Sequence, residues 1–449
     1  MQITHFKGSG IRGYMDFDIH FKEKLHFLIG INGSGKTTVL KLMSALITPS
    51  YLDLSQIEFA NIEMELLLDN NVSTVISCSK SKNSIKLRYE NTEDQIPISD
   101  LNFRDNRYPI EFLLDKIRND LMLFEEKAVV KRIRSLETPL FLGLNRRFFD
   151  NPIIQIEKDS MFPRRRSPNL DTFFDSVDIA LRDIQDMFNE VTRNNSRSQF
   201  LLADKFRKNV FEESFKIQTP SLSDNIDYKR ELEQLNEKKK TFDEAINLLE
   251  MKGLTSSFND FFEEMSNILE TLTNTTSLNE SFKPNEDYIN ALINWMINSE
   301  QLKRIDNIIS YANQYSTSIQ GLKKPFNRFV DSVNLFFAEG EKQIKVEESG
   351  DIKVIIGQKK NSIFELSSGE KQLVIILAHV AFNKKLNKNS APIFIIDEPE
   401  LSLHISWQEK FVDALIQANP GTQFIMATHA PAIIARNERK VLCIDLSKN

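Results

Sequence analysis

The sequence predicts an α/β protein whose sheet-forming part is split into two halves by a mostly helical insertion. Short strand-like segments alternate with turns and a helix over residues 1–165, and strands and helices alternate again over residues 340–449. Residues 166–339 between them are dominated by long amphipathic stretches rich in Glu, Lys, Leu and Asn. We therefore expect the two ends to form one unit with a mixed sheet, and the middle to form a short arm or a helical bundle.

Composition limits the class of protein. The chain has 449 residues, enough for two or three compact units, and its net charge of −6 argues against a wholly basic coat for nucleic acid. The two cysteines, Cys78 and Cys443, have no metal-like spacing, which is typical of a reduced cytosolic protein. No apolar run reaches the ~18 residues that a spanning helix needs. We expect a soluble, cytoplasmic protein with no membrane partner.

The N-terminal half carries a glycine-rich loop between a strand and a helix. The segments "ITHF" and "MDFDIHF" alternate as strands do, "KLHFLIG" is a buried-strand run, and "KTTVLKLMSAL" is helical; residues 56–100 are again strand-rich. Between strand and helix lies "GINGSGKTT", which fits G-x-x-x-x-G-K-[ST]. A glycine turn that merely contains a lysine is the alternative, but the strand-loop-helix context favours a nucleotide site.

Each residue type in this loop suits a phosphate ligand. Glycines let backbone N–H groups approach phosphates at a helix N-terminus, Lys36 should reach the β- and γ-phosphates, and the Thr37 hydroxyl should bind Mg²⁺. The predicted nucleotide-binding residues are Gly30, Asn32, Gly33, Ser34, Gly35, Lys36, Thr37 and Thr38.

The insertion contains no sustained heptad pattern, so we expect no long coiled-coil arm, and the longest helix should be only a stub of some tens of ångströms. Gly253 is a plausible helix C-cap, and Pro220 and Pro284 interrupt the region.

The C-terminal half has two buried strands that end in polar residues. "APIFIIDEPE" places Asp397 at a strand tip, where it can hold Mg²⁺, and Glu398 beside it as a general base for water. "FIMATHAPAII" ends a neighbouring strand with His429, which could contact the γ-phosphate. Either segment alone could be an ordinary strand with a charged loop; together with the upstream phosphate loop they indicate an ATP site.

The segment "LSSGEKQ", Leu366 to Gln372, resembles the signature motif of ABC-type ATPases. In that superfamily the signature caps ATP held by a second head. The resemblance implies that Ser367, Ser368 and Gly369 bind the nucleotide of a partner copy, in a head-to-head dimer or higher homo-oligomer, with a helix N-terminus facing the anion.

The split arrangement is similar to the SMC, Rad50 and RecF group, although the insertion is too short for an SMC arm and lacks a C-x-x-C hook. "DEPELSLHISWQEKF", "FLGLNRRF" and "VNLFFAEGEKQIKV" are similar to the ATPases of OLD nucleases and phage-defence systems. OLD nucleases continue into a Toprim nuclease domain, whereas this sequence ends twenty residues after His429. The chain therefore resembles the stand-alone ATPase subunits of PARIS-type or Septu-type systems.

This resemblance implies an ATPase that senses a phage protein or DNA and controls a separate nuclease encoded in the same operon. Glu398 would activate water, and Lys36 with His429 would stabilise the transferring phosphoryl group. The alternatives are a RecF-like repair ATPase that binds DNA, and a scaffold that holds ATP without hydrolysis. The intact Glu398 and His429 argue against the scaffold.

Several smaller features leave alternatives open. Arg12 occupies a place where related heads put an arginine near the nucleotide, but it could equally be a solvated turn residue. The basic clusters Lys131 to Arg134 and Arg164 to Arg166 could touch DNA or an acidic partner, or lie on solvated faces. The glutamine that completes a Mg²⁺ shell in related heads could be Gln56, Gln95 or Gln155.

Overall fold

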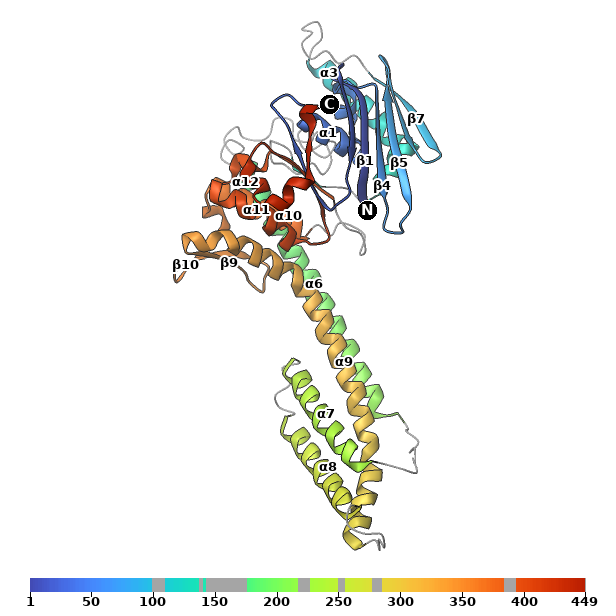
Figure 1. Ribbon diagram of the computed structural model, residues 1–449, viewed down its shortest axis with the longest axis vertical. Coiled ribbons are helices and arrows are strands. Elements are labelled where there is room, and N and C mark those ends of the chain that lie inside the picture. The colour runs from blue at the N-terminus through green and yellow to red at the C-terminus, as the bar shows by residue number, and fades with distance from the viewer. Residues whose placement is uncertain are drawn as a thin grey trace. The chain divides into compact units, whose positions relative to one another are not determined.

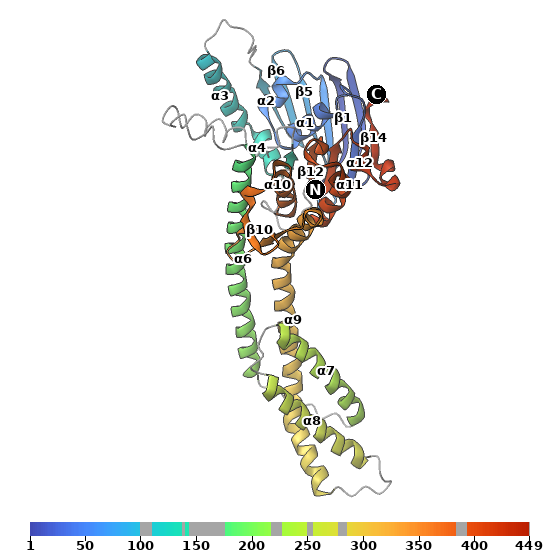
Figure 2. The same cartoon turned by 90° about the vertical axis from the view of Figure 1, so that its left-hand side faces the viewer.

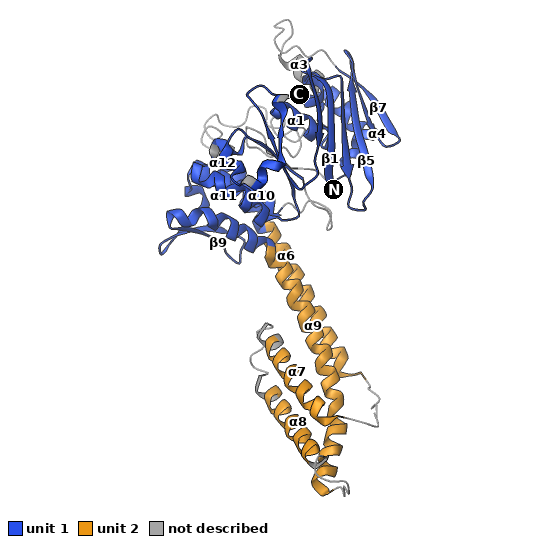
Figure 3. Ribbon diagram, in the orientation of Figure 1, with its two compact units in different colours: residues 1–189, 325–449 blue, residues 190–324 orange. Residues whose placement is uncertain are grey.

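The computed structural model describes residues 1–98, 110–136, 140–142, 176–216, 227–248, 255–276, 285–382 and 393–448. The chain divides into two compact units, residues 1–189 with 325–449, and residues 190–324 (Figure 3). The first unit carries all the motifs, so both ends of the sequence do belong to one unit. Its boundaries fall inside helices α6 (Ser176–Ser214) and α9 (Glu286–Phe337), and the three-part division at 165/166 and 339/340 stays a prediction.

The predicted α/β class is confirmed, and the described parallel and antiparallel pairings lie in separate sheets. The parallel sheet has the order β14-β3-β13-β12-β8 (Cys443–Asp445, Leu25–Ile29, Gln423–Ala427, Ile393–Asp397, Leu140–Leu142). The larger antiparallel sheet has the order β2-β1-β4-β5-β6-β7 (Met15–His20, Gln2–Ile11, Asn61–Leu67, Ser73–Lys80, Ser84–Tyr89, Thr92–Pro97). The smaller one has the order β11-β10-β9 (Lys359–Ser362, Ile352–Ile356, Lys342–Val346).

The described α-helices are α1 (Lys36–Ile47), α2 (Tyr51–Gln56), α3 (Ile110–Glu126), α4 (Ala128–Arg134), α6 (Ser176–Ser214), α7 (Tyr228–Leu248), α8 (Thr255–Thr276), α9 (Glu286–Phe337), α10 (Ser368–Phe382), α11 (Ile405–Ala418) and α12 (Pro431–Ile434) (Figure 1).

The parallel sheet brings the three strand-end motifs to one edge. Every residue of β12 and β13 is buried, which explains their continuous apolar runs. The register pairs Asp397 with Ala427, and Ala427 with Leu28. Because these strands are parallel, the loops after β3, β12 and β13 all leave from the same side.

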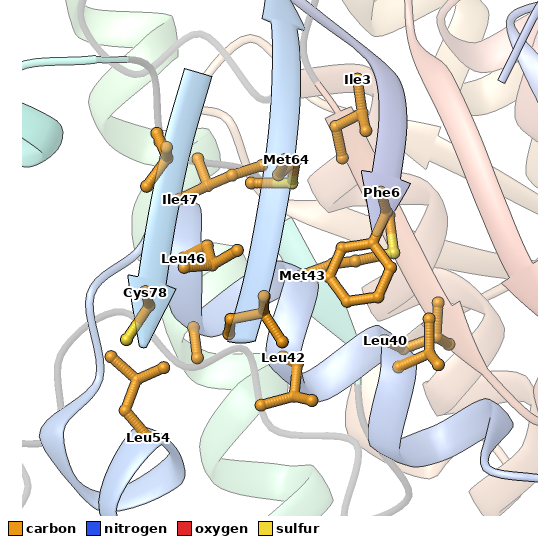
Figure 4. Packing of buried hydrophobic residues seen from close by; sticks show 14 of the residues in the cluster. Ile3, Phe6, Leu40, Leu42, Met43, Leu46, Ile47, Leu54, Met64 and Cys78 are labelled. Carbon is orange, nitrogen blue, oxygen red and sulfur yellow. The ribbon is translucent and has the colours of Figure 1, made fainter. Parts of the chain in front are cut away.

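Helix α1 lies between the parallel and the larger antiparallel sheet, within one continuous apolar core. Its Leu42, Met43, Leu46 and Ile47 are fully or almost fully buried. Figure 4 shows these side chains beside those of the antiparallel strands, such as Met64. This packing fixes the helix that begins directly after the glycine loop.

In the second unit, α7, α8 and the first part of α9 form a helical bundle around a core that includes Phe242, Phe262 and Trp295 (Figure 2). Farther along α9, the described part of α6 runs antiparallel to it. The ring of Phe206 lies 5.7 Å from that of Tyr315, and Asn307 donates a 2.7 Å hydrogen bond to Glu213. None of the described helices combines the length and apolar character needed to cross a bilayer.

Helix length in the insertion was underestimated. Helix α9 has 52 residues and α6 has 39, longer than the absence of a heptad pattern suggested. Pro325 lies inside α9, where proline usually interrupts a helix. Packing against neighbouring helices stabilises a helix without a strict heptad, which is why the sequence pattern failed. Gly253, Pro220 and Pro284 lie outside the described residues.

Candidate nucleotide-binding site

The glycine loop has a backbone that requires glycine. Gly30, Gly33 and Gly35 have φ values of 153°, 87° and 88°. A Cβ at Gly30 would lie 2.6 Å from Ser34 Oγ, and one at Gly35 would lie 2.9 Å from Phe17 Cζ. The buried hydroxyl of Ser34 has no hydrogen-bond partner among the described residues. The loop therefore holds an unsatisfied polar atom where the motif expects a phosphate.

Lys36 is folded back onto the same loop. Its buried ammonium donates hydrogen bonds to the carbonyl oxygens of Gly30 (3.1 Å) and Ile31 (3.2 Å). Burial lowers the pKa of Lys36, while Glu398 and nearby acidic groups oppose that effect. A bound phosphate could replace these neutral acceptors by charged ones, which make stronger hydrogen bonds.

Thr37 and Asp397 meet at the edge of the sheet although 360 residues separate them. The Thr37 hydroxyl donates a 3.3 Å hydrogen bond to Asp397 Oδ1. Asp397 is 4% exposed, and its Oδ2 is buried without a partner among the described residues. Burial raises the pKa of Asp397, and the Thr37 hydrogen bond opposes this rise. A hydroxyl and an unsatisfied carboxylate fit the oxygen ligands that Mg²⁺ prefers.

Glu398 follows Asp397 in a backbone conformation that is rare for a non-glycine residue. Its φ and ψ are 48° and 60°, and its N–H donates a 2.9 Å hydrogen bond to the Ala427 carbonyl. Such conformations cluster at functional sites, where the surrounding structure holds them in place. The chain thus turns sharply at the residue predicted to be the base.

His429 follows the neighbouring strand β13, and a residue that the sequence did not single out orients its backbone. Glu400 Oε1 accepts hydrogen bonds from the N–H groups of His429 (2.7 Å) and Ala430 (3.2 Å). The His429 side chain is exposed. The "DEPE" spacing carried the signal for Glu400, since this third acid of the motif lies only three residues after Asp397.

The signature segment starts α10 with a capping box. Ser367 Oγ accepts a hydrogen bond from the Glu370 N–H (3.4 Å), and Glu370 Oε2 accepts one from the Ser367 N–H (2.9 Å). Lys342 Nζ lies 2.8 Å from the other Glu370 oxygen. Ser367 and Ser368 are exposed, and no described hydrogen bond joins them or Gly369 to the glycine loop of the same chain. The S-x-x-E spacing would have predicted this cap.

The Arg12 side chain is exposed in the β1–β2 turn, with φ 53° and its N–H bonded to the Glu58 carbonyl (2.8 Å). The turn leads into Met15 and Phe17, which lie against Gly35. Arg12 therefore neighbours the strand that covers the loop, and its contact with a nucleotide stays a prediction.

The basic cluster Lys131 to Arg134 is largely neutralised, because Arg132 pairs with Glu90 at 2.8 Å and Arg134 pairs with Glu125. Gln56 ends α2, and Gln95 donates to the Ser84 hydroxyl. Gln155 and Arg164 to Arg166 lie outside the described residues.

Two of the segments that resemble phage-defence ATPases contact each other. The Trp407 ring lies 5.6 Å from that of Phe336, and Glu339 accepts hydrogen bonds from Ser406 (3.4 Å) and Lys410. The two segments therefore pack against each other, which gives a structural reason for both to occur in one chain. Of "FLGLNRRF", only Phe141 and Leu142 are described, in β8.

Two curated relatives have similar sequences. The retron Vc95 probable ATPase of Vibrio cholerae serotype O1 biovar El Tor is 34% identical over 113 residues, covering 23% of this chain and 22% of that protein. The retron Ec83 probable ATPase of Escherichia coli is 28% identical over 137 residues, covering 26% of this chain and 25% of that protein. The chain thus spans about a quarter of the length of each relative.

Among solved structures, the SMC head domain with an extended coiled coil bound to the C-terminal domain of ScpA from Pyrococcus furiosus has a TM-score of 0.37 and 13% identity, covering 96% of this chain and 91% of that one. The SMC head domain from Thermotoga maritima has a TM-score of 0.35 and 11% identity, with coverages of 97% and 93%.

A family model extends over almost the whole sequence. The model of the AAA ATPase domain matches residues 1–434, which include the glycine loop, the signature segment, Asp397 and His429. The chain belongs to the AAA ATPase domain family, and the prediction that it is an ATPase is confirmed at that level.

Proposed function

We propose that the chain binds ATP with Mg²⁺ at the edge of the parallel sheet and hydrolyses it to ADP and phosphate. The observation that carries the proposal is the Thr37–Asp397 pair, in which a buried carboxylate oxygen lacks a partner beside the glycine loop. Bound there, Mg²⁺ would neutralise charge on the phosphate oxygens. A metal ion would satisfy this buried oxygen, which is costly to leave without a partner.

The surrounding residues have distinct roles in this proposal. The loop from Gly30 to Thr38 cradles phosphates with its N–H groups, and Lys36 moves from its carbonyl partners to the γ-phosphate. Glu398 accepts the proton of the attacking water. His429, held through its backbone by Glu400, donates to the phosphate oxygens.

We further propose that two chains pair, so that the signature of one meets the nucleotide of the other. The exposed Ser367 and Ser368, at the start of the 15-residue helix α10, support this arrangement, because a helix N-terminus attracts anions. The capping box holds that terminus in shape before any nucleotide arrives.

The biological role that fits best is a regulatory ATPase in an anti-phage defence system of the PARIS or Septu kind, controlling a separate nuclease. The motif resemblances and the two retron probable ATPases among the relatives support this role. A phage protein or DNA would act as the trigger. The RecF-like alternative gains no support from Arg132 and Arg134, because their charges are already paired.

A capture experiment tests this role. The Glu398→Gln chain is expressed with its genomic neighbours and purified in ATP, and Lys36→Ala serves as the control that cannot hold nucleotide. We expect a stoichiometric nuclease-like protein with the first variant and less of it with the second. Capture of DNA without a protein partner would contradict the role as a nuclease regulator.

A further inference from the structure

Three metal-binding side chains gather on the outer face of the larger antiparallel sheet, outside the nucleotide site. His5 lies on β1, and Asp18 and His20 lie on β2. In β2 the apolar side chains point inward and alternate with these polar ones, as the period of two requires. The register places His5 opposite His20, so all three side chains share one face.

Their ligand atoms converge. His5 Nε2 lies 2.6 Å and His20 Nε2 lies 3.4 Å from the same oxygen, Asp18 Oδ1. The three ligand atoms all lie within 4.8 Å of one another, and among the described residues this is the group with that property. The two imidazole rings are stacked, with centroids 4.2 Å apart and an angle of 2° between their planes. Both rings thus present their Nε2 atom to the same carboxylate oxygen.

We propose that His5, Asp18 and His20 bind a first-row transition metal ion of the Zn²⁺ type. In a tetrahedral site, metal–ligand distances of about 2.0–2.2 Å put neighbouring ligand atoms about 3.3–3.5 Å apart. The Asp18–His20 distance already fits, and the Asp18–His5 distance would have to open by about 0.7 Å. Metal binding would also require the two parallel rings to tilt, because each Nε2 lone pair lies in the plane of its ring. Three protein ligands leave one coordination position open.

The donor set distinguishes this site from the nucleotide site. Imidazole nitrogens favour Zn²⁺, Co²⁺ and Ni²⁺, whereas the hydroxyl and carboxylate of Thr37 and Asp397 favour Mg²⁺. Lys7 lies opposite Asp18 in the register and is the competing cation. However, the Asp18 carboxylate makes its hydrogen bond with His5, so it is directed at the histidines and not at Lys7.

The location links the metal to the loop. Phe17, between Asp16 and Asp18 on β2, points inward and lies against Gly35 of the glycine loop. A metal that joins β1 to β2 through their outward side chains would hold this strand over the loop.

Titration of the whole 449-residue chain with Co²⁺ tests the proposal. The protein is stripped with a chelator and kept in millimolar Mg²⁺, which competes with Co²⁺ for the proposed Thr37–Asp397 site. We expect one equivalent of Co²⁺ per chain, with the visible absorption of a nitrogen-ligated low-coordinate ion, and displacement by Zn²⁺. His20→Ala and Asp18→Asn should each weaken binding by about tenfold or more.

The control is Glu63→Gln, which removes an exposed carboxylate from the same face of the sheet, on β4, and should leave the titration unchanged. The His20 and Asp18 side chains are 63% and 57% exposed, so these variants should fold, and circular dichroism verifies it. The proposal is overturned if the wild-type protein binds no stoichiometric Co²⁺, or if both variants bind it as the wild type does.

Discussion

At the scale of single residues, burial of Asp397 disfavours its ionised form in the folded chain. Burial raises the pKa of its carboxyl above the ordinary 3.8, against the hydrogen bond from Thr37. The unfolded chain therefore loses this proton at lower pH than the folded chain. The free energy of unfolding should fall as pH rises from 3.8 through the folded pKa, and remain reduced at neutral pH.

Asp397→Asn should remove this dependence. Without ATP or Mg²⁺ at pH 7, we expect the variant to be about 0.5–2 kcal/mol more stable in thermal denaturation, while ATP hydrolysis is lost. The matched control is Asp413→Asn, which removes a carboxylate that accepts a 2.8 Å hydrogen bond from Arg436 and pairs with the buried Arg439. It should lower stability. If Asp397→Asn also lowers stability, the folded chain tolerates ionised Asp397 and this prediction is wrong.

Glu400 should act as a positioning residue for His429. Glu400→Ala removes the acceptor of two backbone hydrogen bonds, and we expect kcat to fall about 10- to 100-fold with little change in KM. Glu400→Gln keeps a side-chain oxygen and should recover most of the rate. If Gln is as slow as Ala in steady-state ATPase assays, the carboxylate has a role beyond these two bonds.

At the scale of elements, the start of α10 allows the predicted roles of its two serines to be tested separately. Ser367 and Glu370 cap α10, whereas no described hydrogen bond involves the Ser368 side chain. Glu370→Ala should cost about 1–2 kcal/mol of stability, because it removes half of the capping box and the partner of Lys342. Ser368→Ala should change stability by less than about 0.5 kcal/mol, yet reduce hydrolysis.

Chemical denaturation and ATPase assays on both variants measure the two effects separately. Equal destabilisation by both substitutions would show that Ser368 also belongs to the cap. Normal hydrolysis by Ser368→Ala would remove it from the nucleotide site.

The elements next to the motifs were predictable, because a buried apolar run such as β12 has a strong local signal. Helix α9 was not. Proline has a high local cost inside a helix, yet tertiary packing keeps Pro325 within a 52-residue helix.

At the scale of the whole molecule, paired heads can be tested by mixing two defective chains. Lys36→Ala has no working phosphate loop but an intact signature, and Ser368→Arg has the reverse. Random pairing of equal amounts makes half of the dimers mixed, each with one intact composite site, so about a quarter of the wild-type activity should return. No recovery over either variant alone would contradict sites shared between chains.

The meeting of distant residues was only partly predictable. Motif chemistry placed Thr37 and Asp397 around one Mg²⁺, and the structure brings them within hydrogen-bond distance. The Glu400 contacts and the His5–Asp18–His20 group were missed, because both depend on which strands pair and in which register. Register is set by burial across the whole sheet and leaves no local mark at His5, Asp18 and His20, whereas for Glu400 the "DEPE" spacing was the one local signal.

The strand order has a consequence for synthesis on the ribosome. Strand β3 is an early segment, yet in the sheet it lies between β14 and β13, which come from the end of the chain. At about 5–20 residues per second, roughly 400 residues must be translated after β3, so it waits roughly 20–80 s for its neighbours. Until then β3 has no partner in its sheet, and the nucleotide site cannot assemble before Asp397 and β13 have been synthesised.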